Sequence, residues 1–271
     1  MAFLGNIAIG KYLATGSPLH RLDPRTKFLA VLVLMAVLLA SNRLLPLLLA
    51  IAFLSLLVRL ARIPQKMVIA NLRAFLWLFF FTFVLHALMT PGTVFWRLPY
   101  LGHTLTFEGL ERGAVLSLRL AAVIVTVSLL TLTTAPLELT AGLERLFRPL
   151  ARFGFPAGET ALMISIALRF IPVLIDETER LYKAQLARGA DFSGNLFQRV
   201  RNLLPLLVPM FVSAFGHADR LALAMECRGY QPNAPRTSYR PLRLASRDLY
   251  AILLVLAAAG LLTWLPLDRL L

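Results

Sequence analysis

The sequence predicts an all-α integral membrane protein with about five transmembrane helices and several cytoplasmic amphipathic helices. Hydrophobic residues make up 58% of the 271 residues, whereas soluble domains are usually about 45–50% apolar. The formal net charge of +14 is carried by Lys and Arg that lie between long apolar runs. This distribution indicates orientation in a lipid bilayer and contact with anionic headgroups, and we expect no nucleic-acid partner.

Two short spans are predicted near the start of the chain. Residues 1–27 are expected to form a cytoplasmic lead-in, at whose end Asp23-Pro24 has the pattern of an N-cap followed by proline at the first helical position. One helix over 28–58 would be about 46 Å long, too long for a single crossing of a roughly 30 Å core. We therefore predict two spans with a tight turn at residues 41–43.

Three further apolar runs predict the remaining spans. The basic segment 59–73 precedes them, and Pro64 begins an amphipathic piece within it. An aromatic loop over 91–111 suits a membrane interface. Apolar runs long enough to cross the bilayer place the spans at 72–90, 113–134 and 249–265.

The stretch 136–247 differs from the rest, because no run within it looks apolar for the roughly 20 residues that a span requires. Its pattern predicts a short amphipathic helix over 136–150 and two long helices over 158–188 and 196–228, with a kink at Pro172. The sequence thus predicts a lead-in, four spans, a cytoplasmic coupling-helix region and a last span, at 1–27, 28–135, 136–247 and 248–271.

The basic residues give this topology a direction. Of the 28 Lys and Arg, 23 lie on one side of the predicted membrane, in 1–27, 59–73 and 136–247. The positive-inside rule makes that side cytoplasmic. We therefore expect a multi-pass protein of the plasma membrane with a cytoplasmic N-terminus.

No catalytic, cofactor or metal site is predicted. The chain has no P-loop, no H-E-x-x-H and no G-x-S-x-G, and its four histidines are scattered. The predicted spans contain no Asp or Glu, which proton-coupled transporters and membrane hydrolases usually need. Two other classes remain open: a membrane enzyme that acts on lipid headgroups and a stand-alone secondary transporter.

Two polar residues have alternative interpretations. Arg119 is the one charge well inside a predicted span, and it either anchors a partner or neighbouring span or snorkels to the outer end. His217 lies beside Gly216 in a helical pattern, where a packed, satisfied histidine is more common than a switch.

One pattern occurs twice within the coupling-helix region. Residues 179–189 and 219–229 both read acid-Arg-Leu-x-x-Ala-x-x-x-Arg-Gly, and each copy ends a long helical pattern with Arg in the last turn. One copy alone would be an ordinary cap, because a basic residue complements the helix dipole and glycine commonly follows the helix end. Two copies on adjacent helices present two guanidinium groups, which suit carboxylates or helix C-terminal carbonyls.

The second of these helices also carries a row of small residues, Ala214, Ala218 and Ala222. Such a row lets another helix approach closely. Two rigid helices with an Arg at each tip could transmit motion, provided that an acidic socket receives each tip. The chain has no separate acidic domain, so we expect the socket on another protein.

Several stretches together resemble one family. They are residues 17–27 (Ser-Pro-Leu-His-Arg-Leu-Asp-Pro-Arg-Thr-Lys), 136–150 around Gly142-Leu143-Glu144, 161–174, and the two Arg-Gly motifs. Over almost its whole length the chain resembles the transmembrane T component (EcfT/CbiQ type) of energy-coupling factor (ECF) transporters, which are ABC-type importers of vitamins and metal ions.

The resemblance implies partners and residue roles. A T component is a non-catalytic subunit that joins two ABC-type ATPase subunits to a substrate-binding membrane subunit, the S component, so that ATP hydrolysis in the partners moves the coupling helices. Ala214, Ala218 and Ala222 would serve helix crossing and S-component packing. Cys227 stands where the family has alanine. Carried over by position, the ATPase-docking residues are Ala187, Arg188, Gly189, Cys227, Arg228 and Gly229.

Overall fold

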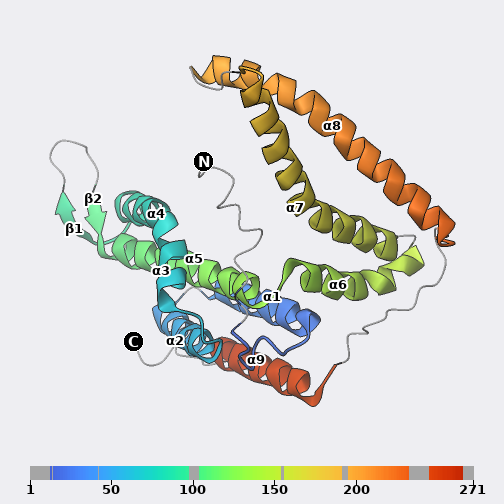
Figure 1. Ribbon diagram of the computed structural model, residues 1–271. Coiled ribbons are helices and arrows are strands. Elements are labelled where there is room, and N and C mark those ends of the chain that lie inside the picture. Colours follow the sequence, from blue (N-terminus) through green and yellow to red (C-terminus); the bar gives the residue numbers. More distant parts are fainter. Residues whose placement is uncertain are drawn as a thin grey trace. The chain divides into compact units, whose positions relative to one another are not determined.

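The protein is an all-α membrane protein, as predicted, with one short β-hairpin (Figure 1). The computed structural model describes residues 13, 15–41, 43–97, 104–153, 156–190, 195–231 and 244–264. The chain separates into two compact units. Residues 10–142 and 242–271 form the membrane unit, and 143–241 form most of the other, here called the arm unit.

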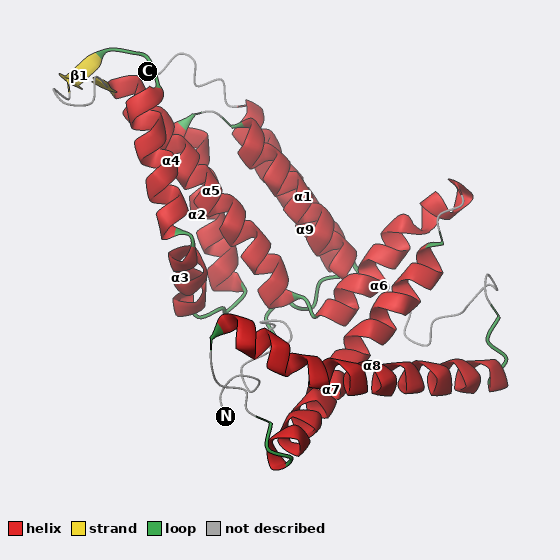
Figure 2. Ribbon diagram, turned by 90° about the horizontal axis from the view of Figure 1, so that it is seen from above, coloured by secondary structure: helices red, strands yellow, loops and turns green. Residues whose placement is uncertain are grey.

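The membrane unit is a helical bundle built around one long helix, α5 (Phe107–Thr133), which contacts α1, α2, α3 and α4. Its apolar core includes Leu38, Leu47 and Leu132. Figure 2 shows the helices of this bundle from above. The other elements are α1 (Pro24–Ala40), α2 (Leu44–Leu60), α3 (Gln65–Ala74), α4 (Leu76–Met89), β1 (Val94–Arg97), β2 (Thr104–Thr106), the first half of α6 (Pro136–Phe147), and α9 (Ser246–Trp264).

The predicted start of α1 and the break after it are confirmed. The side chain of Asp23 caps the helix by accepting from the backbone N–H of Arg25, and Pro24 occupies the first helical position. The helix ends at Ala40 and α2 begins at Leu44, so the turn falls where the length argument placed it. At 17 residues each, these helices are about 26 Å long.

The helices at the third and fourth predicted spans have other bounds than the predicted spans. The apolar run over 72–90 is broken at Phe75, where α3 and α4 meet at a bend of 55°. The hairpin of β1 and β2 lies within the predicted loop. The helix that contains the predicted fourth span begins before residue 113, because Thr106 caps α5 by accepting from Gly109 N–H at 3.1 Å and the helix begins at Phe107. This helix therefore includes Glu108 and Glu111, although the predicted span contained no acid.

The arm unit consists of the end of α6, a 3₁₀ turn (Arg148–Phe153) and two long helices, α7 (Ala157–Ala187) and α8 (Leu196–Cys227). Figure 1 shows α7 changing direction along its course, and Pro172 lies within it. The two helices run in opposite directions and cross (Figure 2), so their C-terminal ends lie at opposite ends of the unit.

One expectation about the arm unit was wrong. By length and composition, the helices of the described chain that could cross a membrane are α5, α7 and the part of α8 over Arg201–Cys227, with α3 and α4 together as a fourth, bent span. The region 136–247 therefore does contain runs apolar enough to span, because the first halves of α7 and α8 are so rich in large apolar residues. The assignment of these helices to the cytoplasmic side stays a prediction.

Candidate coupling site

The first Arg-Gly motif forms the end of α7. The helix ends at Ala187, and Arg188 is the C-cap, one residue later than the expected last turn. Gly189 has φ +84° and donates to Leu186 O at 3.0 Å, while Ala190 donates to Gln185 O at 3.0 Å. These two bonds form a Schellman motif, which satisfies carbonyls that the helix end leaves free.

The second motif ends α8 with the same geometry. Arg228 is the C-cap, and Gly229 has φ +72°. Gly229 donates to Glu226 O at 2.9 Å and Tyr230 donates to Met225 O at 3.0 Å. A Cβ on either glycine would meet nothing within 4 Å, so the positive φ, and not a lack of space, accounts for glycine at both positions.

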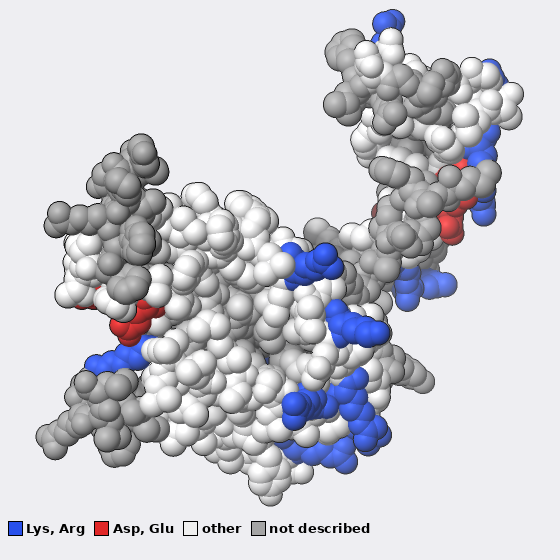
Figure 3. Space-filling model, turned by 90° about the vertical axis from the view of Figure 1, so that its left-hand side faces the viewer, with Lys and Arg blue, Asp and Glu red and all other residues white. Residues whose placement is uncertain are grey.

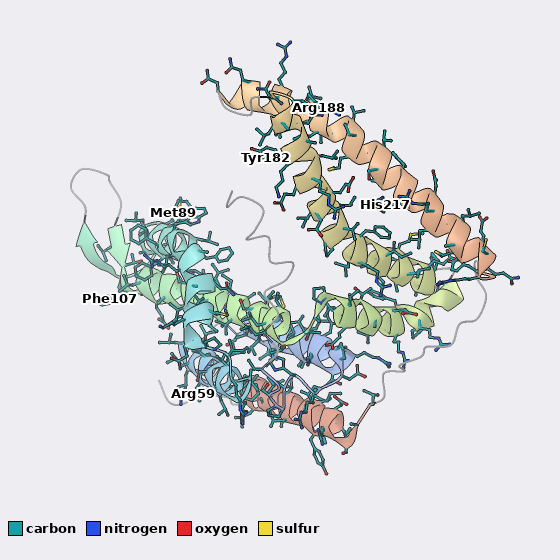
Figure 4. All side chains as sticks on the ribbon, viewed as in Figure 1. Arg59, Met89, Phe107, Tyr182, Arg188 and His217 are labelled. Carbon is teal, nitrogen blue, oxygen red and sulfur yellow. The ribbon has the colours of Figure 1, made fainter. Side chains whose placement is uncertain are left out.

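The repeated sequence therefore gives a repeated structure with exposed side chains. Ala187, Arg188, Cys227 and Arg228 are all exposed, and Figure 4 shows Arg188 at the tip of α7. Because each Arg side chain extends from a capped helix end, its base is held rigidly while its guanidinium stays available. Each tip can donate several hydrogen bonds to a carboxylate or to carbonyl groups of a partner.

Polar and aromatic contacts hold α7 and α8 together where they cross. Thr178 Oγ1 lies 3.2 Å from Met210 Sδ, and Ser213 Oγ donates to Glu177 Oε1 at 3.3 Å. The ring of His217, which lies on α8 (Figure 4), meets the Phe170 ring edge to face, with centroids 6.1 Å apart. Side-chain contacts of this kind connect the two helices near their middles.

His217 has a satisfied position in this contact. Its Nδ1–H donates to Ser213 O at 2.8 Å, and the ring is half-buried. A carbonyl acceptor fixes the proton on Nδ1 in the neutral ring, and Nε2 is then an acceptor. The position is that of the packed histidine expected from the sequence.

The alanine row lines a groove between α7 and α8. The groove has a volume of about 430 Å³, and its α8 wall includes Ala214, Ala218 and Ala222. Large apolar residues make up most of the rest of the lining, and His217, Glu226 and Tyr230 are its titratable members. The three alanines leave room for the side chains or backbone of another helix. The lining is mostly apolar, which suits contact with another helix.

Around the middle of α8, large apolar side chains are exposed on the arm unit. Val208, Val212 and Phe215 are each about two-thirds exposed. Exposed apolar surface on this scale marks contact with protein or lipid.

Within α7, the ion pair between Glu179 and Lys183, at 2.7 Å, supports the helix just before its Arg tip.

Comparison with known proteins decides the family. The family model CbiQ, described as a cobalt transport protein, matches residues 15–239. The chain belongs to the EcfT/CbiQ family. This confirms the resemblance that the N-terminal stretch, the α6 segment and the paired Arg-Gly motifs carried.

Curated EcfT relatives match almost the whole chain. The energy-coupling factor transporter transmembrane protein EcfT of Bacillus subtilis is 42% identical over 265 residues, 97% of this chain and 99% of the relative. EcfT of Heliobacterium modesticaldum is 45% identical over 266 residues, covering 96% and 97%, and EcfT of Acidaminococcus fermentans is 42% identical over 263 residues, covering 97% of each. The relatives are named as transmembrane energy-coupling components, which fits a non-catalytic transporter subunit.

The N-terminal stretch of this EcfT/CbiQ chain forms a polar cluster at one end of the membrane unit. Ser17 Oγ lies 2.7 Å from His20 Nδ1. Lys27 Nζ donates to His20 O at 3.2 Å and to Thr133 O at 2.9 Å, so it caps the last turn of α5. Gly142 of α6 packs against Pro24, where a Cβ would come within 2.9 Å of Pro24 Cβ.

Sequence reasoning missed Asp248, which completes this cluster. Its carboxylate accepts from the backbone N–H of Asp23 at 2.8 Å and from Ala245 N–H at 2.8 Å. Asp248 lies in the first turn of α9, where an acid is favourable to the helix dipole. An acid in the first turn of a helix was visible in the sequence, but it did not identify the backbone of Asp23 as the partner of Asp248.

Arg119 in α5 contacts a neighbouring span, as one of its two interpretations expected. Its guanidinium donates to the backbone carbonyl of Ser41, at the turn between α1 and α2. It also lines a polar pocket of about 660 Å³ with His86, Glu108, Glu111 and Arg112. Across the described ranges, no group of three or more His, Cys, Asp or Glu is placed to hold a metal ion.

Proposed function

We propose that this chain is the energy-coupling subunit of an ABC-type ECF importer and transmits ATP-driven motion from two ATPase subunits to a substrate-binding S component. The transported solute would be a vitamin or a metal ion. The observation that carries the proposal is the pair of exposed Arg side chains, Arg188 and Arg228, on two helix ends capped by the same Schellman geometry.

The geometry of the tips supports docking to two partners. The two helices run in opposite directions, so the tips lie at opposite ends of the arm unit (Figure 1). One subunit can therefore engage two separate acidic sockets, one at each tip. Ala187 and Cys227, the residues before each Arg, are small, and both leave the guanidinium accessible.

The crossing contact supports transmission between the tips. The two helices touch through Thr178, Met210 and Phe170–His217 near their middles. A displacement at either tip then acts on this crossing, because each helix is continuous from the crossing to its tip. The groove lined by Ala214, Ala218 and Ala222 lies at the same crossing, and we assign it to packing of the S component.

The proposed orientation follows from charge. The tips must face ATPases in the cytoplasm, and the positive-inside rule places the same region, 136–247, on that side. We therefore propose a plasma-membrane location with a cytoplasmic N-terminus. The proposal assigns ATP hydrolysis to the partner subunits.

The deciding experiment co-expresses the chain with its candidate ATPases and S component and isolates the complex in mild detergent. Arg188→Ala and Arg228→Ala should each reduce solute uptake, and the double variant should lose the ATPases. Arg180→Ala is the matched control, because Arg180 is also exposed on α7 but lies two turns before the tip. Normal uptake and ATPase retention in the double variant would refute the proposal.

A further inference from the structure

A cavity of about 190 Å³ lies within the membrane unit, at the end where α1 begins and α5 ends. Four helices enclose it: the N-terminal halves of α1 and α9, and the C-terminal halves of α2 and α5. Its walls are almost entirely aliphatic; Leu54 is buried, whereas Leu60 and Leu254 are exposed and mark its open side. An aliphatic cavity of this kind suits a hydrocarbon chain.

One polar atom in the wall has no partner. Thr126 and Thr133 also line the cavity, but their hydroxyls donate within α5, to Ala122 O at 2.8 Å and to Leu129 O at 2.7 Å. Thr26 is 1% exposed, and its Oγ1 has no hydrogen-bond partner among the described residues. Buried hydroxyls are nearly always hydrogen-bonded, so this one calls for an acceptor that enters the cavity.

The charge around the cavity is mixed at its buried end and basic at its surface. Lys27, also in its wall, donates to neutral carbonyls and interacts electrostatically with Glu138, Asp23 and Asp248, so its charge is matched within the membrane unit. Exposed Arg21 and Arg59 directly adjoin the lining residues Leu22 and Leu60 in sequence. In Figure 3 most of the Lys and Arg side chains seen on the membrane unit lie towards one side, and one basic group lies at the opposite edge beside acidic side chains.

We propose that this cavity binds an anionic glycerophospholipid. A segment of one acyl chain fills the aliphatic cavity, an ester oxygen of the lipid accepts from the Thr26 hydroxyl, and the phosphate headgroup lies near the basic residues at the open side. An uncharged lipid would satisfy the first two features and not the third. The proposal depends on the chain being a membrane protein and is independent of its coupling to ATPases.

The test uses the full chain, stripped of lipid in dodecyl maltoside. It is titrated with dioleoylphosphatidylglycerol, dioleoylphosphatidylcholine or oleate, and binding is read by native mass spectrometry and by the melting temperature. We expect one tightly bound phosphatidylglycerol per chain, a raised melting temperature, and weaker binding of the other two compounds. Equal binding of all three would overturn the proposal, because it would show a site for any alkyl chain.

A matched pair of variants tests the role of the hydroxyl. Thr26→Val keeps the shape of the side chain and removes the donor, so phosphatidylglycerol affinity should fall about fivefold, as for the loss of one hydrogen bond. Thr126→Val removes a hydroxyl from the same cavity that is already bonded within its helix, and its effect on affinity should be much smaller. Thr26→Ser should retain the wild-type affinity.

The stability of the lipid-free protein gives a second test of Thr26. Without lipid, Thr26→Val should melt no lower than the wild type, because it removes an unsatisfied buried group. A fall in its lipid-free melting temperature, or equal lipid affinities of Thr26→Val and Thr126→Val, would show that Thr26 is not the contact and would overturn this assignment.

Discussion

Asp248 accepts a hydrogen bond from the backbone N–H of Asp23 at 2.8 Å, although 225 residues separate the two in the sequence. Asp23 itself caps α1, and Asp248 lies in the first turn of α9. The bond therefore joins the starts of the first and last helices of the membrane unit. It closes the bundle at the end where Lys27 caps α5.

Removal of the Asp248 carboxylate should destabilise the membrane unit. The side chain is 3% exposed and satisfies two backbone N–H groups, so Asp248→Ala leaves both without an acceptor. We expect a loss of about 1–3 kcal/mol for each buried group left unsatisfied, measured as a lower melting temperature in detergent. Asp248→Asn keeps one oxygen acceptor and should lose less. An unchanged melting temperature for Asp248→Ala would contradict this role.

The capping glycines should respond to alanine differently from a glycine inside the same helix. Gly189 and Gly229 have positive φ, which costs a residue with a side chain about 1–2 kcal/mol. Gly216 lies inside α8 with open space around it, so alanine there should stabilise the helix by about 0.5–1 kcal/mol. Hydrogen exchange of the last helical turns would measure both effects. Equal exchange in Gly229→Ala and the wild type would exclude a structural need for glycine there.

Local chemistry made the helix ends predictable from the sequence. Asp23-Pro24 and the two Arg-Gly pairs each contain their own capping signal, and the structure confirms all three ends. The start of α5 carried a signal too, because Thr106 is followed by Glu108 in the first turn. The prediction placed the start at 113 because it followed apolarity alone, and the polar first turn of α5 is not apolar.

Tertiary partners were the part that the sequence could not supply. Nothing near Asp248 in the sequence identifies Asp23 as its partner, and nothing near Arg119 identifies Ser41. The bend at Phe75 likewise has no proline or glycine to announce it. In the arm unit, the small-residue row was visible in the sequence, whereas the opposite wall of its groove comes from α7 and required the structure.

Loss of the Arg119 guanidinium should loosen the turn between α1 and α2. Its bond to Ser41 O joins that turn to the middle of α5, and a hydrogen bond from a charged group contributes about 1.5–3 kcal/mol. We therefore expect Arg119→Met to lower the melting temperature in detergent and to speed hydrogen exchange at the turn. Arg112→Met is the control, because Arg112 is exposed two turns earlier on the same helix. Equal effects of the two substitutions would favour a general effect of charge at that end of the bundle.

A substitution in the alanine groove of the arm unit should affect binding of the S component and leave binding of the ATPases unchanged. Ala218 lines the groove, whereas Ala224 is exposed on the same helix outside it. Filling a packed contact with a larger side chain costs about 1–3 kcal/mol, so Ala218→Leu should weaken retention of the S component about tenfold. Ala224→Leu should not.

Both variants leave Arg188 and Arg228 unchanged, so each should still retain the ATPases. Quantitative pull-down of the assembled complex would report the two partners separately. Loss of the ATPases together with the S component in Ala218→Leu would mean that the groove supports the tips and does not receive the S component. Loss of the S component alone in Ala218→Leu would assign the groove to that partner. The control Ala224→Leu adds the same side chain to the same helix, but outside the groove.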